Sequence, residues 1–171
     1  YQTTIYDDIL TISGADIILN DPAGEIFTDK GNDTVIVTDS TITNNSTTGA
    51  ELMFSLGTDD DSLTISNSTL NANTFMGSGD DTLSVENSTF NAELSAGSGN
   101  DSITLNKSTF NKDVSAGNGE DSVLITGDVL SQVTLKGQLL LGTENDTLTL
   151  SSILTGGNID FGDGIDTLIF D

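Results

Sequence analysis

The chain has 171 residues, with 27 Asp and Glu against 4 Lys and no Arg, Cys, His or Trp, and its formal charge is −23. The length predicts a single domain, and the missing residue types exclude a disulfide framework, a zinc or haem site and a histidine general base. The negative charge excludes a nucleic-acid partner, whose phosphates it would repel, and no apolar run is long enough for a membrane span.

A short unit recurs along the chain: an Asp, called the anchor below, followed by residues of alternating polarity. The anchors are Asp8, Asp33, Asp61, Asp81, Asp101, Asp121, Asp146 and Asp166. They are 20 residues apart from 61 to 121 and from 146 to 166, and 25 or 28 residues apart elsewhere. A period near 20 built from strand-forming residues is typical of a solenoid, in which stacked units bury a continuous core. This periodicity argues against disorder, which the apolar fraction of 35% would otherwise suggest.

The segment after each anchor has the pattern of a half-buried strand. In the copy at 62–66, Leu63 and Ile65 alternate with Ser and Thr. We therefore predict an all-β fold, a parallel β-solenoid (β-helix or β-roll) with about eight coils of roughly 20–28 residues. It would be a single segment over 1–171, with irregular coils at 1–56, regular coils at 57–126 and terminal coils at 127–171. We expect this segment to be part of a longer protein.

The remainder of each coil contains further apolar stretches. A large apolar residue lies nine positions after most anchors, at Ile17, Ile42, Leu70, Phe90, Phe110 and Leu130. Asn71, Asn91 and Asn111 come next and are expected to form a hydrogen-bonded ladder at a corner. Another apolar stretch, such as Leu94 with Ala96, precedes the following turn. The coil is therefore expected to have two long faces, or three, with Phe90 stacked on Phe110.

The turn before each anchor is rich in glycine and acid, as in Gly77-Ser78-Gly79-Asp80-Asp81. Stacking would place the anchor carboxylates in a ladder, where each neighbouring pair repels by roughly 0.8 kcal/mol at ~5 Å in water. The 4 lysines cannot neutralise this charge. Calcium accepts about six to eight oxygen ligands from carboxylates and carbonyls, so we predict several calcium ions stacked along the turns. The alternative is a set of solvated turns held by Asx hydrogen bonds.

The predicted metal ligands are the anchor carboxylates and the carbonyls of the glycine turns. They are Asp33, Asp61, Asp81, Asp101, Asp121, Asp146 and Asp166, together with Gly77, Gly79, Gly97, Gly99, Gly117, Gly119, Gly162 and Gly164. Glycine suits this role because it adopts backbone conformations that other residues resist, and because it lets a carbonyl approach a ligand closely.

The turns resemble the calcium-binding repeat of the repeats-in-toxin (RTX) family, Gly-Gly-x-Gly-x-Asp followed by a strand. Residues 77–83, 97–103 and 162–168 match this motif apart from its first glycine. Here the turn occurs once per 20 residues, which is more similar to the solenoids of large bacterial surface adhesins with one calcium per coil. Asp59 and Glu144 stand where the motif has its second glycine. The resemblance implies a secreted protein of the bacterial cell surface or extracellular matrix.

Three functions are compatible with these residues. The first is a structural or adhesive spacer that calcium stabilises. The second is a self-assembling filament or surface-layer subunit, whose copies associate end to end. The third is a ligand-binding module for a glycan, a host receptor or ice on a metal-free β-helix of the autotransporter type. Its candidate site is the irregular stretch before the regular coils, with its longer insertions and its Thr41–Thr48 tract. An enzyme is not expected, because the carboxylates recur in every coil whereas an active site interrupts a repeat once.

Overall fold

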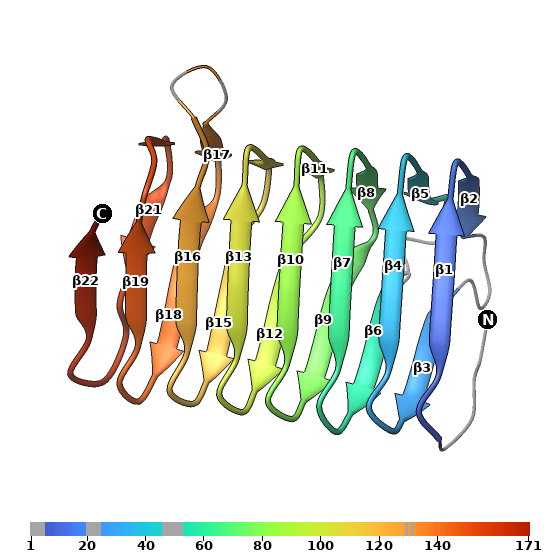
Figure 1. Ribbon diagram of the computed structural model, residues 1–171, viewed down its shortest axis with the longest axis horizontal. Coiled ribbons are helices and arrows are strands. Elements are labelled where there is room, and N and C mark those ends of the chain that lie inside the picture. Colours follow the sequence, from blue (N-terminus) through green and yellow to red (C-terminus); the bar gives the residue numbers. More distant parts are fainter. Residues whose placement is uncertain (1–5, 20–24, 46–52, 129, 131) are drawn as a thin grey trace.

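The computed structural model describes residues 6–19, 25–45, 53–128, 130 and 132–171. These residues form strands and turns, and none of them belongs to a helix that could cross a membrane. The strands make three parallel sheets of eight, seven and seven strands. Each coil gives one strand to each sheet in turn, and the coils lie side by side along a rod (Figure 1). The predicted parallel β-solenoid of about eight coils is confirmed, and it has three faces.

The first sheet contains the strand that follows each anchor. Its strands, in spatial order, are β1 (Ile9–Ser13), β4 (Thr34–Thr38), β7 (Ser62–Ser66), β10 (Thr82–Glu86), β13 (Ser102–Asn106), β16 (Ser122–Thr126), β19 (Thr147–Leu150) and β22 (Thr167–Phe170). They pair in register, so that Leu83 lies between Leu63 and Ile103. These three side chains are at most 1% exposed, and the alternating Ser and Thr face outward, as predicted.

The second sheet has the shortest strands, and most of them carry a Thr outward and a large apolar side chain inward. Its strands are β2 (Asp16–Leu19), β5 (Thr41–Asn44), β8 (Thr69–Asn71), β11 (Thr89–Phe90), β14 (Thr109–Phe110), β17 (Val133–Leu135) and β20 (Leu154–Thr155). Phe90 stacks on Phe110, with 5.3 Å between ring centroids and 24° between ring planes. Of the tract proposed for ligand binding, Thr41–Asn44 form β5, and residues 46–48 lie outside the described residues.

The core position of this second sheet was predicted correctly except at one coil. Ile42, Leu70, Phe90 and Phe110 are buried, and Ile17 is partly buried against the same core. The assignment of Leu130 to this column was wrong, because its side chain is 91% exposed. The segment between β16 and β17 is longer than in the regular coils, so the ninth residue after the anchor no longer falls in the second sheet. Leu135 therefore takes the core position and pairs with Phe110.

The third sheet ends at the turns that carry the anchors. Its strands are β3 (Ile26–Lys30), β6 (Met53–Thr58), β9 (Asn73–Ser78), β12 (Leu94–Ser98), β15 (Val114–Asn118), β18 (Gln138–Thr143) and β21 (Asn158–Asp160). Leu94 with Ala96 and Val114 with Ala116 are buried, which confirms the predicted apolar stretch. These inward side chains complete one narrow core between the three sheets, in which few aromatic residues are needed.

Two of the three corners are held by neutral side-chain ladders. Between the second and third sheets, Nδ2 of Asn91 donates to Oδ1 of Asn71 over 2.6 Å, and Nδ2 of Asn111 donates to Oδ1 of Asn91, as predicted. The serine corner lies between the first and second sheets and consists of Ser40, Ser68, Ser88 and Ser108. Each serine Oγ accepts a backbone N–H from the preceding coil over 3.0–3.1 Å. Each Oγ also donates to the carbonyl two residues earlier over 2.6–2.7 Å.

Candidate metal centre at the aspartate corner

The third corner, between the third and first sheets, is the aspartate corner that carries the glycine turns. Gly77 and Gly79 have φ angles of 123° and 136°, in the region that favours glycine. A Cβ on Gly77 would lie 1.9 Å from the carbonyl oxygen of Gly57 in the preceding coil. The turn therefore needs glycine for two reasons, the backbone conformation and the close stacking of successive coils.

The other glycines predicted as ligands have the same surroundings. They are Gly97, Gly99, Gly117, Gly119, Gly162 and Gly164. Their φ angles lie between 77° and 151°, and a Cβ on any of them would come within 2.1 Å of a carbonyl oxygen of the preceding coil. This packing requirement accounts for the glycines by itself. Their role as carbonyl ligands stays a prediction.

The anchor side chains point inward and form a column, called the inner ladder below. It consists of Asp33, Asp61, Asp81, Asp101, Asp121, Asp146 and Asp166. In each coil Oδ1 of the anchor accepts the backbone N–H of the anchor in the preceding coil, over 2.7–3.0 Å. The structure therefore brings all the predicted aspartate ligands into one column.

The second oxygen of each buried anchor has no partner. Oδ2 is buried without a hydrogen bond at Asp33, Asp61, Asp81, Asp101, Asp121 and Asp146, and these side chains are only 1–2% exposed. An unsatisfied buried carboxylate oxygen is costly, because it has lost its water and gained nothing in exchange. Asp166 differs because its side chain is half-buried, while its Oδ1 still accepts the N–H of Asp146 over 3.0 Å.

Burial raises the pKa of five inner-ladder carboxyls, those of Asp61, Asp81, Asp101, Asp121 and Asp146. Loss of water is the largest cause, the accepted backbone N–H opposes it, and neighbouring carboxylates raise the pKa further. From an ordinary 3.8, the pKa of Asp61, Asp101 and Asp121 rises to about 7 and that of Asp81 to about 6. The pKa of Asp146 is raised by the same causes. A cation or a proton at Oδ2 would relieve this cost.

A second column, the outer ladder, was not predicted from the sequence. It consists of the residues that precede the anchors, among them Asn32, Asp60, Asp80, Asn100 and Asn145. In this column each residue donates its backbone N–H to the side chain of the equivalent residue one coil earlier. Asp80 donates to Oδ1 of Asp60 over 2.9 Å, and Asn100 donates to Oδ1 of Asp80 over 2.7 Å. The inner and outer ladders therefore run in opposite directions. The sequence signal for this column is the Asp, Asn or Glu that precedes most anchors.

The two acids at glycine positions act as local hydrogen-bond acceptors. Asp59 and Glu144 have φ angles of 81° and 77°. Oδ2 of Asp59 accepts the N–H of Gly31 over 3.3 Å, and Oε2 of Glu144 accepts the N–H of Gly119 over 3.0 Å. These carboxylates satisfy a glycine amide of the preceding coil, so the turn keeps its shape without the second glycine.

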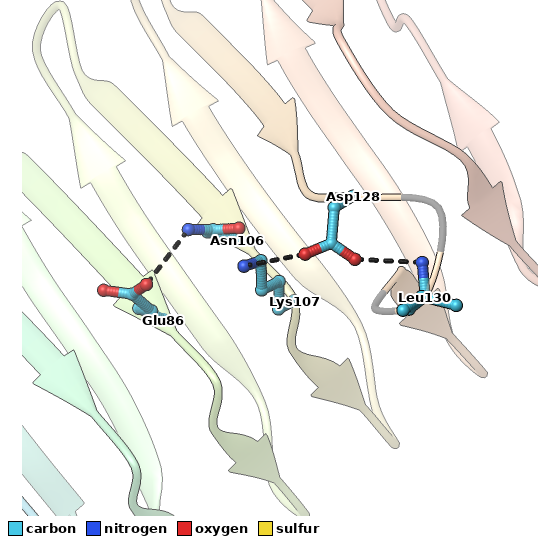
Figure 2. Close-up of polar contacts among 5 residues, drawn as sticks. All are labelled: Glu86, Asn106, Lys107, Asp128 and Leu130. Atoms are coloured by element: carbon cyan, nitrogen blue, oxygen red, sulfur yellow. Dashed lines mark hydrogen bonds and ion pairs between the residues drawn. The ribbon is translucent and has the colours of Figure 1, made fainter.

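The lysines of the described residues do not neutralise the aspartate corner. Nζ of Lys107 instead pairs with Oδ2 of Asp128 over 3.1 Å, away from the aspartate corner, in the turns that follow β13 and β16. Figure 2 shows this pair, with Oδ1 of Asp128 accepting the N–H of Leu130, and Glu86 accepting from Asn106 nearby. The charge of the inner ladder is therefore balanced by no cationic side chain in the part of the chain that the structure describes.

The donor set of the aspartate corner fits a hard cation. It offers one unpartnered carboxylate oxygen per buried coil, beside closely stacked glycine turns whose carbonyls are hard oxygen donors. No group of three or more His, Cys, Asp or Glu suited to a metal occurs among the described residues, so carbonyls or water would have to complete the shell. No protein-family model, curated protein or solved structure matches the chain. The likeness to RTX repeats therefore rests on the turn motif.

Proposed function

We propose that this chain is a calcium-stabilised structural or adhesive segment of a secreted protein of the bacterial cell surface or extracellular matrix. The observation that carries the proposal is the row of six buried Oδ2 atoms without a hydrogen-bond partner. Asp33, Asp61, Asp81, Asp101, Asp121 and Asp146 would hold the ions, with turn carbonyls as further ligands. The RTX-like turns support calcium as the metal and secretion as the route.

Calcium at this corner would neutralise the inner ladder and join successive coils. The N–H groups of the corner already use Oδ1, so Oδ2 is the atom left for the cation. Calcium fits better than magnesium, which demands a strict octahedral shell. Because the ligands lie on different coils, binding favours the stacked state over the unfolded chain and stiffens the rod. Such a rod is rigid where calcium is abundant.

A structural role explains why the carboxylates repeat. The same side chain takes the same hydrogen bond in seven successive coils, from Asp33 to Asp166. A catalytic pair would differ from its neighbours at one coil, since acid and base need different surroundings. We therefore propose a function without catalysis.

A calcium titration followed by circular dichroism and calorimetry tests this proposal. We expect the melting temperature to rise with calcium, to fall with EGTA and to respond far less to magnesium at the same concentration. Asp101→Asn should lower the number of ions bound, and Asp80→Asn, an exposed outer-ladder change of equal charge, should not. An EGTA-treated protein with an unchanged spectrum and melting temperature would refute the calcium proposal.

A filament or surface-layer subunit is a second candidate, and the edge of the first sheet would be its interface. In β22, Leu168 and Ile169 are each 42% exposed and Phe170 is 76% exposed. Apolar side chains on an unpaired strand edge can pair with another strand, either of a second copy or of further coils. Calcium-dependent growth of filaments in electron microscopy would support this candidate, and monomers at all calcium concentrations would count against it.

A further inference from the structure

The outer surface of the third sheet contains a hollow that belongs to none of the ladders. It has a volume of about 220 Å³ and is lined by Phe75, Glu93, Leu94, Ser95, Asp113, Ser115 and Leu140. This is smaller than the roughly 300–1,000 Å³ of sites for drug-sized ligands, so it suits one side chain or one small group. The residues come from four successive coils, through β9, β12, β15 and β18 or the residues just before these strands.

The hollow arises from an interruption in one outward column. Phe75, Ser95, Ser115 and Leu140 occupy equivalent positions in paired strands. Their chain neighbours, such as Leu94 and Ala96, are buried, so these four side chains point outward. Two small serines therefore form a floor between two large apolar walls. The walls stand on strands three spacings apart, or ~14 Å.

One end of the hollow is acidic. Glu93 and Asp113 precede β12 and β15, and both side chains are exposed. Oδ1 of Asp113 accepts the N–H of Gln138 over 2.8 Å, which fixes the orientation of this carboxylate. Within the described residues neither acid forms an ion pair. The hollow is thus apolar at its walls and negative at one end.

We propose that this hollow, lined by Phe75, Leu140, Ser95 and Ser115 and closed by Glu93 and Asp113, binds a lysine or arginine side chain of a partner protein. These side chains have the same two parts, an apolar stem and a cationic head. The stem lies between Phe75 and Leu140, and the head reaches the two carboxylates. The proposal does not rest on calcium binding at the aspartate corner, which is on a different part of the coil.

Charge complementarity selects this occupant over others of similar size. An acidic ligand would meet Glu93 and Asp113 and the −23 charge of the whole chain. A purely apolar side chain would gain nothing from the two exposed carboxylates. A cation gains from both acids and from the face of an aromatic ring such as Phe75. The acidic surface would also speed the encounter with a basic partner.

The test uses blocked pentapeptides, Gly-Gly-Lys-Gly-Gly and its arginine version, titrated into the protein by NMR. A norleucine peptide keeps the stem without the charge, and methyl glucoside represents a sugar ligand. We expect shifts of the backbone amides of Ser95 and Ser115 with the cationic peptides. Glu93→Gln and Phe75→Ala should each weaken binding by about two- to fivefold, the scale of exposed ion-pair and cation–π contacts.

Ser95→Leu should abolish the localised shifts, because leucine fills the floor of the hollow. Ser55→Leu is the matched control, since Ser55 occupies the same outward column but does not line the hollow. Glu86→Gln removes the same charge on the first sheet and should change nothing. Three results would overturn the proposal: shifts spread over all acidic turns and insensitive to Ser95→Leu, equal binding of the norleucine peptide, or localised binding of the sugar alone.

Discussion

The serine corner and the aspartate corner of each coil perform the same backbone task with different side chains. In both, a side-chain oxygen accepts the N–H of the equivalent residue one coil earlier: Oγ of Ser88 from Ser68, and Oδ1 of Asp101 from Asp81. The serine then donates its own hydrogen to the carbonyl of Glu86, so no polar atom is left over. The aspartate has no hydrogen to donate, and its Oδ2 stays buried without a partner.

This difference shows that stacking the coils does not by itself require a carboxylate. A neutral hydroxyl satisfies the amide just as well, at a similar distance and burial. The extra oxygen is costly, and it recurs in six described coils. Some other factor must favour aspartate at this corner. The cation that we propose would account for the position and the spacing of these oxygens.

Acid without calcium should produce the largest change in stability, and we expect it to act mainly through the aspartate corner. The folded pKa of Asp61, Asp101 and Asp121 is about 7 against 3.8 for the free side chain, so the folded state binds more protons between these values. The free energy of unfolding is then highest near pH 4 and falls as the pH rises through about 7. Melting temperatures measured in EGTA from pH 4 to 8 check this.

With saturating calcium the slope at the acid end should reverse. The ligands must be deprotonated, so a falling pH releases the metal together with its stabilisation. A general effect of net charge would also favour the folded state in acid, since it relieves repulsion. The variant with Asp81, Asp101 and Asp121 all changed to Asn separates the two. If it keeps the full slope in EGTA, the inner ladder is not the cause.

The same triple Asn variant should be more stable than the native chain in EGTA at pH 8. Asparagine keeps the Oδ1 acceptor and removes a buried charge, which we expect to gain about 1–3 kcal/mol per site. In calcium the order reverses, because the variant loses the metal. The matched control changes Asp60, Asp80 and Glu120 to Asn, Asn and Gln on exposed positions of the same coils. Denaturant melts of both variants with and without calcium provide the comparison.

The backbone of the two corners should also respond differently to substitution. Gly97→Ala places a Cβ 2.1 Å from the carbonyl oxygen of Gly77 at a φ of 121°, and we expect a loss of about 3 kcal/mol or more. Asn87, beside the serine corner, has a φ of 47°, in the left-handed region that Asn tolerates better than most residues, so Asn87→Gly should change stability by less than about 1 kcal/mol. Equal effects in urea melts would show that close stacking is not specific to the glycine turns.

The fold and the inner ladder could be predicted because both follow from simple periods in the sequence. Alternation in 62–66 gives the strand, and the 20-residue repeat places Asp61, Asp81 and Asp101 in one column. The position of Leu135 could not be obtained by counting from Asp121, because this coil has 25 residues and the sequence does not say where the extra five lie. The direction of the hydrogen bonds in the two ladders, and the lack of a partner for six Oδ2 atoms, depend on the backbone path at the corner. These features could not be predicted from the sequence. The hollow was hidden because Ser95 and Ser115 look like any outward serine of a strand.

The serine corner itself should show the smallest effect and none that depends on calcium. Ser88→Ala removes the acceptor of the Ser68 N–H and the donor to the Glu86 carbonyl, and all three groups lie at the same corner. We expect a loss of about 1–2 kcal/mol, the cost of leaving the Ser68 N–H without a partner, since the Glu86 carbonyl still accepts the N–H of Asn67. The loss should be equal in calcium and in EGTA and constant from pH 5 to 8, because serine neither titrates nor binds the ion. A calcium-dependent loss would mean that the two corners are coupled through the coil, so that the metal stabilises the whole coil and not the aspartate corner alone.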